Sequence, residues 1–162
     1  MRILIAEDEQ SNLEEIKRIL AQADFPVDAD SFLHPNEALN AAMTAPYDAA
    51  LLDIQMPGMN GLVLAERINE LQPEIGLIFI TAFNNYATEA FDLHAIDYIL
   101  KPLRAERLLR ALERIRKTER RKYPNPEFSS VMRIVTFGGL RVFSDAGEVF
   151  WDRPKTRELF AY

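Results

Sequence analysis

Short strand-like runs alternate, over most of the chain, with segments whose apolar residues recur at helical spacing. After the run at residues 2–6, for example, Leu13, Ile16 and Ile19 recur every three residues. Runs of this length, bounded by helical segments, are typical of strands in a parallel sheet. The five runs are residues 2–6, 27–32, 49–52, 77–80 and 96–100. The pattern predicts an α/β fold, a doubly wound five-stranded parallel sheet with helices on both faces.

The pattern changes after the fifth predicted helix. Pro124 and Pro126 interrupt the helical spacing, and beyond them short β-branched and aromatic runs are separated by glycine turns, as in antiparallel hairpins. The candidate strands are residues 133–137, 140–143 and 148–151. A helix is expected to begin at Lys155. So short a segment cannot bury a core alone. We therefore expect three parts, a domain at residues 1–122, a linker at 123–130 and the incomplete beginning of a second domain at 131–162.

Composition narrows the class of protein. Hydrophobic residues make up 48% of the 162 residues and charged residues 27%, proportions typical of a soluble globular protein. The chain has no cysteine, which excludes a disulfide framework and a cysteine-ligated zinc site. Met1 leads into a strand-like run without the apolar region of a signal peptide, and no apolar run approaches ~18 residues. We therefore expect a cytoplasmic protein with no membrane partner.

The net charge of −6 is unevenly distributed along the chain. Residues 1–103 contain 17 acidic and 5 basic residues, a net charge of −12, whereas residues 104–162 contain 8 acidic and 14 basic residues, a net charge of +6. An acidic domain followed by a basic segment indicates two functions on one chain. A single solvated basic helix explains the split equally well, because residues 104–122 hold nine of the cations. Charge alone therefore does not decide whether DNA is a partner.

Polar residues mark the carboxyl ends of four predicted strands. Glu7 and Asp8 follow the first run, Asp53 the third, Thr81 the fourth and Lys101 the fifth. These ends meet at one edge of an open parallel sheet, where ligands usually bind. Each residue alone has an ordinary explanation, because aspartate and threonine are common at caps and turns and lysine is usually a solvated surface charge. Their occurrence in order on four strand ends favours a shared site.

Such a site has the donors for a divalent cation and a phosphoryl group. Adjacent carboxylates repel each other unless a cation lies between them, and Mg²⁺ (or Mn²⁺) binds carboxylates, keeps several waters and bridges to phosphate. We expect four ligands: Asp8 and Asp53 directly, the backbone carbonyl of Gln55, and Glu7 directly or through water. Asp53 stands alone at its strand end and is the expected nucleophile, which would form an aspartyl phosphate. Lys101 would neutralise charge, and Thr81 would hydrogen-bond a phosphoryl oxygen.

The motifs around these positions resemble those of response-regulator receiver domains from two-component signalling. The resemblance covers residues 1 to about 120 and rests on Glu7-Asp8-Glu9, Asp53 with Met56-Pro57-Gly58-Met59-Asn60-Gly61, Thr81-Ala82, and Asp97-Tyr98-Ile99-Leu100-Lys101-Pro102. It implies a flavodoxin-like fold, a sensor histidine kinase as phosphoryl donor, and self-catalysed phosphorylation and dephosphorylation rather than a conventional enzyme. The family's functional positions match Glu7, Asp8, Asp53, Thr81 and Lys101. Tyr98 matches the aromatic residue that turns inward when the threonine moves toward the phosphate.

Two other classes of protein use part of this chemistry. A phosphatase with an aspartate nucleophile also needs a threonine, a lysine and paired carboxylates. Such enzymes typically carry Asp-x-Asp at the nucleophile, whereas Ile54 and Gln55 follow Asp53 here. A flavin-binding protein of the same fold needs a phosphate-cradling loop after the first strand, where Glu7 and Asp8 would repel the phosphate. Both alternatives fit the sequence less well.

The C-terminal segment resembles the start of SARP-type transcriptional activators, whose winged-helix DNA-binding domains are related to the OmpR type. The resemblance rests on residues 136–143, Gly147, Trp151 and residues 153–159. The receiver-like part, at residues 87–91 and 97–98, also resembles receivers attached to LytTR-type DNA-binding domains, which is the competing assignment. Either assignment implies a transcription factor, and an output other than DNA binding is a further alternative.

The receiver resemblance leads to an expectation for the output surface. We expect a homodimer through the fourth helix (residues 84–93), the fifth strand (96–100) and the fifth helix (from residue 104). Acidic residues on the first two can meet basic residues on the third across a two-fold contact. Sequence-specific DNA binding is expected only of the full-length protein, because an opening sheet and a first helix offer no element for the major groove.

Overall fold

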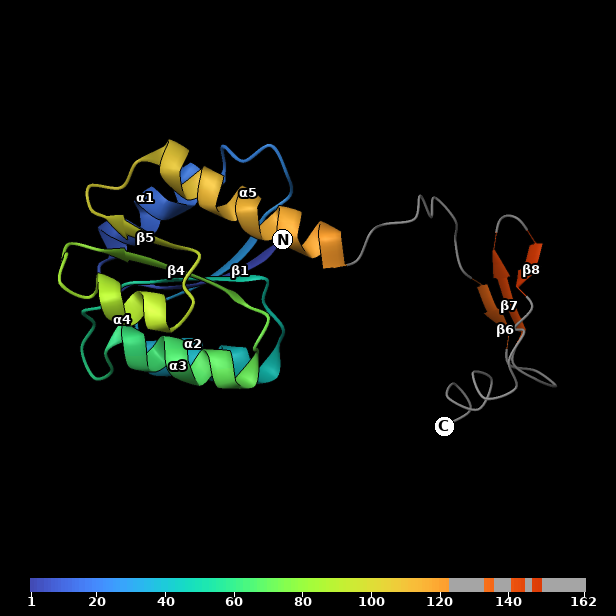
Figure 1. Ribbon diagram of the computed structural model, residues 1–162, viewed down its shortest axis with the longest axis horizontal. Helices are drawn as coiled ribbons and strands as arrows, with labels where there is room; N and C mark the ends of the chain where they lie inside the picture. The colour runs from blue at the N-terminus through green and yellow to red at the C-terminus, as the bar shows by residue number, and fades with distance from the viewer. Residues whose placement is uncertain (123–132, 136–140, 145–146, 150–162) are drawn as a thin grey trace. The chain divides into compact units, whose positions relative to one another are not determined.

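The computed structural model describes residues 1–122, 133–135, 141–144 and 147–149. The chain divides into two compact units, Met1–Lys122 and Tyr123–Tyr162. The first unit holds an all-parallel sheet in the order β2-β1-β3-β4-β5 (Figure 1). Its strands are β1 (Arg2–Ala6), β2 (Asp28–Phe32), β3 (Ala49–Leu52), β4 (Gly76–Thr81) and β5 (Asp97–Leu100). Its helices are α1 (Gln10–Leu20), α2 (Pro35–Thr44), α3 (Gly61–Leu71), α4 (Ala87–Asp92) and α5 (Ala105–Lys122). The predicted α/β fold is confirmed, and this strand order is that of flavodoxin-like folds.

Helices cover both faces of the sheet because successive residues of each strand point to opposite faces. In β1, Ile3 and Ile5 belong to the core that α1 and α5 close, whereas Leu4 and Ala6 belong to the core that α2, α3 and α4 close. All four side chains are fully buried. Figure 1 shows the two helical layers, with α1 and α5 on one side of the sheet and the other three helices on the opposite side.

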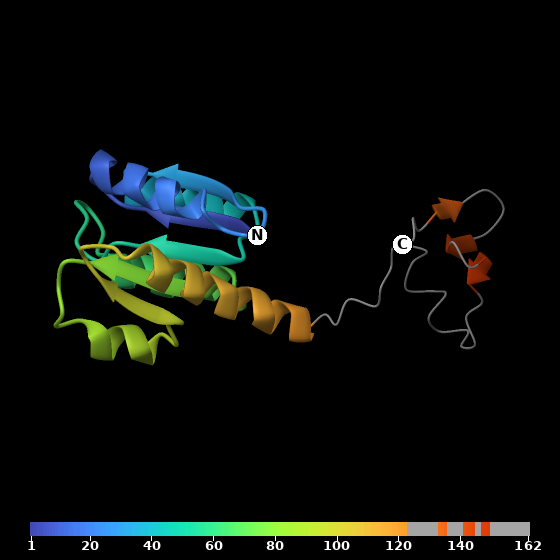
Figure 2. The same cartoon turned by 90° about the horizontal axis from the view of Figure 1, so that it is seen from above.

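The register of the sheet brings the polar strand ends to one edge. Ala6 of β1 pairs with Leu52 of β3, and Thr81 of β4 pairs with Leu100 of β5. Figure 2 shows the strands side by side, from the blue β2 and β1 to the yellow-green β5. The residues that directly follow β1, β3 and β5 therefore leave the sheet at the same edge as the end of β4.

Several elements of the first unit differ from their predicted extent, among them β4, which is one residue longer at each end, and β5, which begins one residue later. β2 begins at Asp28, one residue later than predicted, and none of its residues is fully buried because it is an edge strand. α4 spans only Ala87–Asp92, shorter than the predicted 84–93. Residues 85–86 form a turn before it, and Tyr86 is its N-cap residue.

The described residues of the second unit form three short antiparallel strands in the order β6-β7-β8. They are β6 (Arg133–Val135), β7 (Arg141–Ser144) and β8 (Gly147–Val149), which overlap the three predicted strands. The predicted linker at residues 123–130 and the predicted helix from Lys155 lie outside the described residues. Of the helices that the structure describes, none combines the length and apolar character needed to cross a membrane.

Candidate functional site

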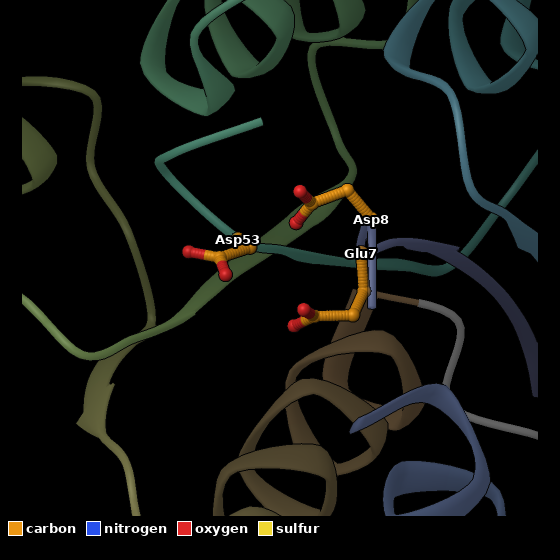
Figure 3. Close-up of side chains that lie close together, drawn as sticks. All are labelled: Glu7, Asp8 and Asp53. Carbon is orange, nitrogen blue, oxygen red and sulfur yellow. The ribbon is translucent and has the colours of Figure 1, made fainter. Parts of the chain in front are cut away.

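Three carboxylates gather at the carboxyl edge of the sheet. Glu7 and Asp8 directly follow β1 and Asp53 directly follows β3. One oxygen from each carboxylate lies within 4.8 Å of the other two (Figure 3). Glu7 is 1% exposed and Asp53 is 7% exposed, whereas Asp8 is half-buried. Like charges held this closely, and largely out of water, are costly unless a cation compensates them.

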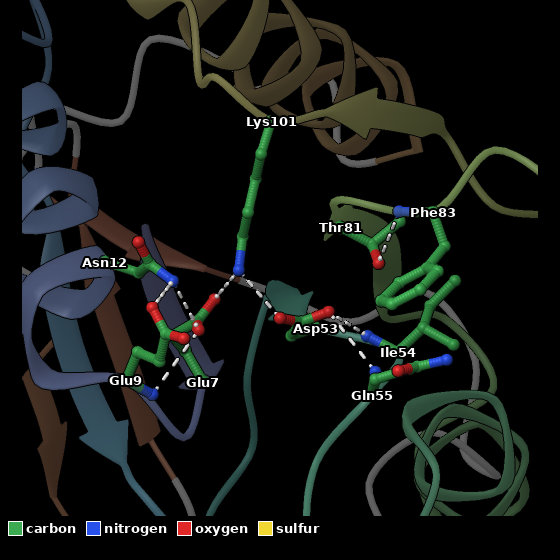
Figure 4. Close-up of polar contacts among 9 residues, drawn as sticks. All are labelled: Glu7, Glu9, Asn12, Asp53, Ile54, Gln55, Thr81, Phe83 and Lys101. Carbon is green, nitrogen blue, oxygen red and sulfur yellow. Dashed lines mark hydrogen bonds and ion pairs between the residues drawn. The ribbon is translucent and has the colours of Figure 1, made fainter.

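Lys101 reaches this cluster from the end of β5. Its Nζ donates hydrogen bonds to Asp53 Oδ2 at 2.7 Å and to Glu7 Oε2 at 2.8 Å (Figure 4). Desolvation by itself lowers the pKa of Lys101, but the hydrogen bonds to Asp53 and Glu7 outweigh it, and the pKa is raised. Lys101 is therefore an ammonium ion in this site. One ammonium beside three carboxylates still leaves the site with a net negative charge.

Glu7 is held through both of its carboxylate oxygens. Oε2 accepts from Lys101, while Oε1 accepts from Asn12 Nδ2 at 2.9 Å and from the backbone N–H of Glu9 at 3.4 Å. Burial raises the pKa of Glu7, and the hydrogen bonds from Asn12 and Lys101 oppose that shift. Asn12 is a site residue that the motifs do not single out. Its signal in the sequence is its place in the first turn of the helix that follows Glu7.

The loop after Asp53 forms an open cleft beside the carboxylates. Asp53 Oδ1 accepts hydrogen bonds from the backbone N–H groups of Ile54 at 2.6 Å and Gln55 at 3.3 Å, so Gln55 lies next to the carboxylate (Figure 4). The cleft has a volume of about 470 Å³ and is lined by Asp8 and residues 54–60. It gives the cluster an open side where waters and a phosphoryl group have room.

Thr81 and Tyr98 are linked through one residue at the rim of the site. Thr81 is fully buried, and its hydroxyl accepts a hydrogen bond from the backbone N–H of Phe83 at 3.4 Å. The hydroxyl of Tyr98 donates to the carbonyl of Phe83 at 2.5 Å, and its ring centroid lies 6.4 Å from that of Phe79. Figure 4 shows Thr81 beside Asp53. Phe83 therefore contacts both Thr81 and Tyr98.

The structure thus brings together the side chains that the sequence singled out. Glu7, Asp8, Asp53 and Lys101 form one cluster, and Thr81 lies next to it. Carboxylate oxygens are hard donors, and a group of three beside an open cleft suits a small divalent cation that keeps several waters. The geometry fits the predicted metal. The individual roles of ligand, phosphoacceptor and switch residue stay predictions, as does the use of the Gln55 carbonyl as a ligand.

The sequence matches the family described as "Response regulator receiver domain" over residues 3–113. It is similar to "Sensory transduction protein LytT" of Oceanobacillus iheyensis, with 39% identity over 120 residues, which are 73% of this chain and 49% of that protein. It is also similar to "Transcriptional regulatory protein BtsR" of Salmonella typhimurium, with 37% identity over 118 residues, which are 72% of this chain and 48% of that protein. The chain spans about half the length of these curated relatives.

A solved structure supports the same fold. The response regulator protein TrrA of Thermotoga maritima, in complex with Mg²⁺ and BeF, has a TM-score of 0.64 and 28% identity, covering 70% of this chain and 97% of that one. The comparisons do not support the SARP or OmpR-type assignment, which rests on residues 136–159, outside the matched family region. The name LytT is consistent with the LytTR alternative.

Proposed function

Because this chain belongs to the response regulator receiver domain family, we propose that it is the phosphoacceptor of a two-component system, with Asp53 receiving the phosphoryl group. A sensor histidine kinase is the proposed donor. The observation that carries the proposal is the position of Lys101, whose ammonium joins the buried carboxylates of Asp53 and Glu7. A fixed positive charge at this place can compensate the charge that a phosphoryl group brings, without reorganisation of solvent.

A divalent cation, Mg²⁺ or Mn²⁺, completes the proposed site. Asp8 and Asp53 would bind it directly, the carbonyl of Gln55 would be a further ligand, and Glu7 would act directly or through water. When bound, such a cation would supply positive charge between the carboxylates and an incoming phosphoryl group. The carboxylate cluster supports this assignment, as does the similarity to TrrA, which was solved with Mg²⁺ and BeF.

The chain's own residues position the reacting groups. A carboxylate oxygen of Asp53 forms a bond to phosphorus while the bond from phosphorus to the donor atom breaks, and the electron pair of that bond leaves with the donor. The backbone N–H groups of Ile54 and Gln55 hold the carboxylate in one orientation. Lys101 can follow the developing charge because its ammonium already contacts Asp53. Thr81 would donate its hydroxyl hydrogen to a phosphoryl oxygen.

The proposed output surface is the face formed by α4, β5 and α5, through which the domain would form a homodimer. Thr81 and Tyr98 link the site to this face through Phe83. Phe91 of α4 is 71% exposed and Leu100 of β5 is 42% exposed, so the face has apolar as well as charged contact area. A ligand shifts a population only by binding its two states differently, and the phosphoryl group would do so through Thr81 and Lys101.

We also propose that the output is transcriptional. The name of the relative BtsR, a transcriptional regulatory protein, supports this, and the name LytT favours a LytTR-type effector over a SARP-type one. Sequence-specific DNA binding is expected only of a protein with a complete effector domain.

Acetyl phosphate should add one phosphoryl group to this chain when Mg²⁺ is present. A small donor tests the acceptor directly, without the kinase. Intact-mass spectrometry should show a single added phosphoryl group, and EDTA should prevent the addition because the carboxylates then repel the incoming phosphate. No addition in the presence of Mg²⁺, or equal addition with EDTA, would contradict the proposal.

Asp8→Asn should weaken Mg²⁺ binding by at least about tenfold, because even residues that only support metal ligands typically contribute that much. Asp8 is the most exposed of the three carboxylates, so the substitution should leave the fold intact. Calorimetric titration with Mg²⁺ measures the affinity, and circular dichroism checks the fold. Asp24→Asn is the matched control, because Asp24 is exposed in the connection between α1 and β2. Equal affinities for the two variants would remove Asp8 from the ligand set.

A further inference from the structure

Asn12, in the first turn of α1, contacts two carboxylates of the site region. Its Nδ2 donates to Glu7 Oε1 at 2.9 Å and to Glu9 Oε2 at 3.0 Å (Figure 4). An amide NH₂ group has two hydrogens, so one neutral side chain can satisfy both acceptors. We propose that Asn12 is a positioning residue that fixes the Glu7 carboxylate, and through it Lys101, for cation binding and phosphoryl transfer at Asp53. This inference rests on the function proposed above.

The position of Glu7 depends on this bond because the alternatives are weak. Without Asn12, Oε1 keeps the backbone N–H of Glu9, and that bond is 3.4 Å long, beyond the usual range for N–H···O bonds. Glu7 is 1% exposed, so water cannot easily replace the lost donor. A carboxylate free to rotate on one side no longer presents Oε2 to Lys101 in a single geometry. The ammonium, which Glu7 shares with Asp53, would lose part of its orientation.

A neutral donor suits this place better than a basic one. A lysine or arginine here would also bond Glu7, but its charge would repel a cation held by the same carboxylates. Asn12 instead joins Glu7 to Glu9 without adding charge. Its backbone is anchored, because its N–H donates to the carbonyl of Glu9 at 3.1 Å. The start of the helix therefore fixes the amide relative to the end of β1.

The structure does not use Asn12 as a helix cap. The N-cap of α1 is Glu9, and its side chain makes no capping hydrogen bond. A capping side chain would accept from a backbone N–H of the first turn, whereas Asn12 Nδ2 donates to carboxylates. The observed bonds direct the side chain toward the site rather than toward the helix end.

The test compares the Mn²⁺ affinities of the Asn12→Ala and Gln10→Ala variants. Mn²⁺ is titrated into each protein without any phosphoryl donor, and binding is monitored by electron paramagnetic resonance. Both variants place alanine, a good helix former, in the first turn of α1. Gln10 bonds only to the exposed Glu14 among its described contacts. We expect Asn12→Ala to weaken Mn²⁺ binding by about tenfold, the lower end of the effect for residues that support metal ligands. We expect Gln10→Ala to match the unmodified chain.

A double-mutant cycle identifies the route of the effect. If Asn12 acts through Glu7, Asn12→Ala should have no further effect on Mn²⁺ affinity in a Glu7→Gln background. An undiminished effect in that background, or an affinity unchanged by Asn12→Ala, would overturn the inference. A lowered melting temperature with unchanged affinity would also overturn it, since it would show a merely structural role. Asn12→Leu replaces Asn12→Ala in the cycle if the alanine variant does not fold.

The failure of this inference is distinguishable from the failure of the proposed function. The inference alone would be overturned if the unmodified chain accepts a phosphoryl group on Asp53 and the Asn12→Ala variant binds Mn²⁺ as tightly as the unmodified chain. An unmodified chain that binds neither Mn²⁺ nor a phosphoryl group would overturn both.

Discussion

Asp53→Asn should abolish the addition of a phosphoryl group by acetyl phosphate while leaving the fold intact. An amide lacks the nucleophilic carboxylate oxygen that the proposed transfer requires. The substitution preserves the shape of the side chain, and the amide oxygen can still accept from the backbone N–H of Ile54. Lys101 keeps its ion pair with Glu7, so its charge remains compensated. Intact-mass spectrometry after a timed incubation with Mg²⁺ measures the result.

The control for this experiment removes a carboxylate elsewhere. Asp24→Asn makes the same chemical change at an exposed position in the connection between α1 and β2, and it should leave phosphorylation unchanged. Equal labelling of Asp53→Asn and the unmodified chain would show that another residue is the acceptor. Labelling lost from both variants would point to a general effect of acidic residues rather than to a specific nucleophile.

The cluster around Asp53 was predictable from the sequence because parallel strands impose its geometry. Once Glu7, Asp53 and Lys101 are each placed directly after a strand, the shared direction of the strands brings them to one edge. No knowledge of side-chain packing is needed for that step. The strand pattern does not show which carboxylates Lys101 contacts. In the structure its Nζ donates to Asp53 at 2.7 Å and to Glu7 at 2.8 Å.

Other features depended on contacts that have no pattern in the sequence. The contact between Asn12 and Glu7 depends on how the first turn of α1 is placed relative to the end of β1. The sequence also did not show that α4 begins only at Ala87, after a turn at residues 85–86, because the residues predicted at 84–93 are compatible with a longer helix. The position of edge strand β2 was predictable, but the predicted strand was one residue too long. The partly exposed residues of this strand give a weak signal for where it begins.

Gly61→Ala should destabilise the first unit by at least about 2 kcal/mol, a typical penalty for inserting a methyl group where the surroundings cannot yield. A Cβ at position 61 would lie 1.9 Å from the backbone carbonyl oxygen of Asp53 and 2.9 Å from Cα of Ile54. These are backbone atoms at the end of β3, held further by the hydrogen bond from the Gly61 N–H to the Ile54 carbonyl at 2.8 Å. Neither can move without displacing the carboxylate that the proposed reaction uses.

Helix propensity predicts the opposite sign, which makes Gly61→Ala a sharp test. Gly61 is the first residue of α3, and alanine is favoured over glycine within helices by about 1 kcal/mol. Gly76→Ala is the comparison, because the three atoms nearest its Cβ would be side-chain atoms of Ile115 (Cδ1 at 2.5 Å, Cγ1 at 2.7 Å and Cγ2 at 3.2 Å) rather than backbone atoms. Urea unfolding should therefore rank Gly61→Ala as the less stable variant. Without denaturant, the Gly61→Ala variant should also be phosphorylated more slowly than the Gly76→Ala variant, since only the methyl group added at residue 61 would clash with the backbone of Asp53. A Gly61→Ala variant as stable as the unmodified chain would show that the loop between Asp53 and α3 can relax, and that the close approach does not hold the carboxylate in place.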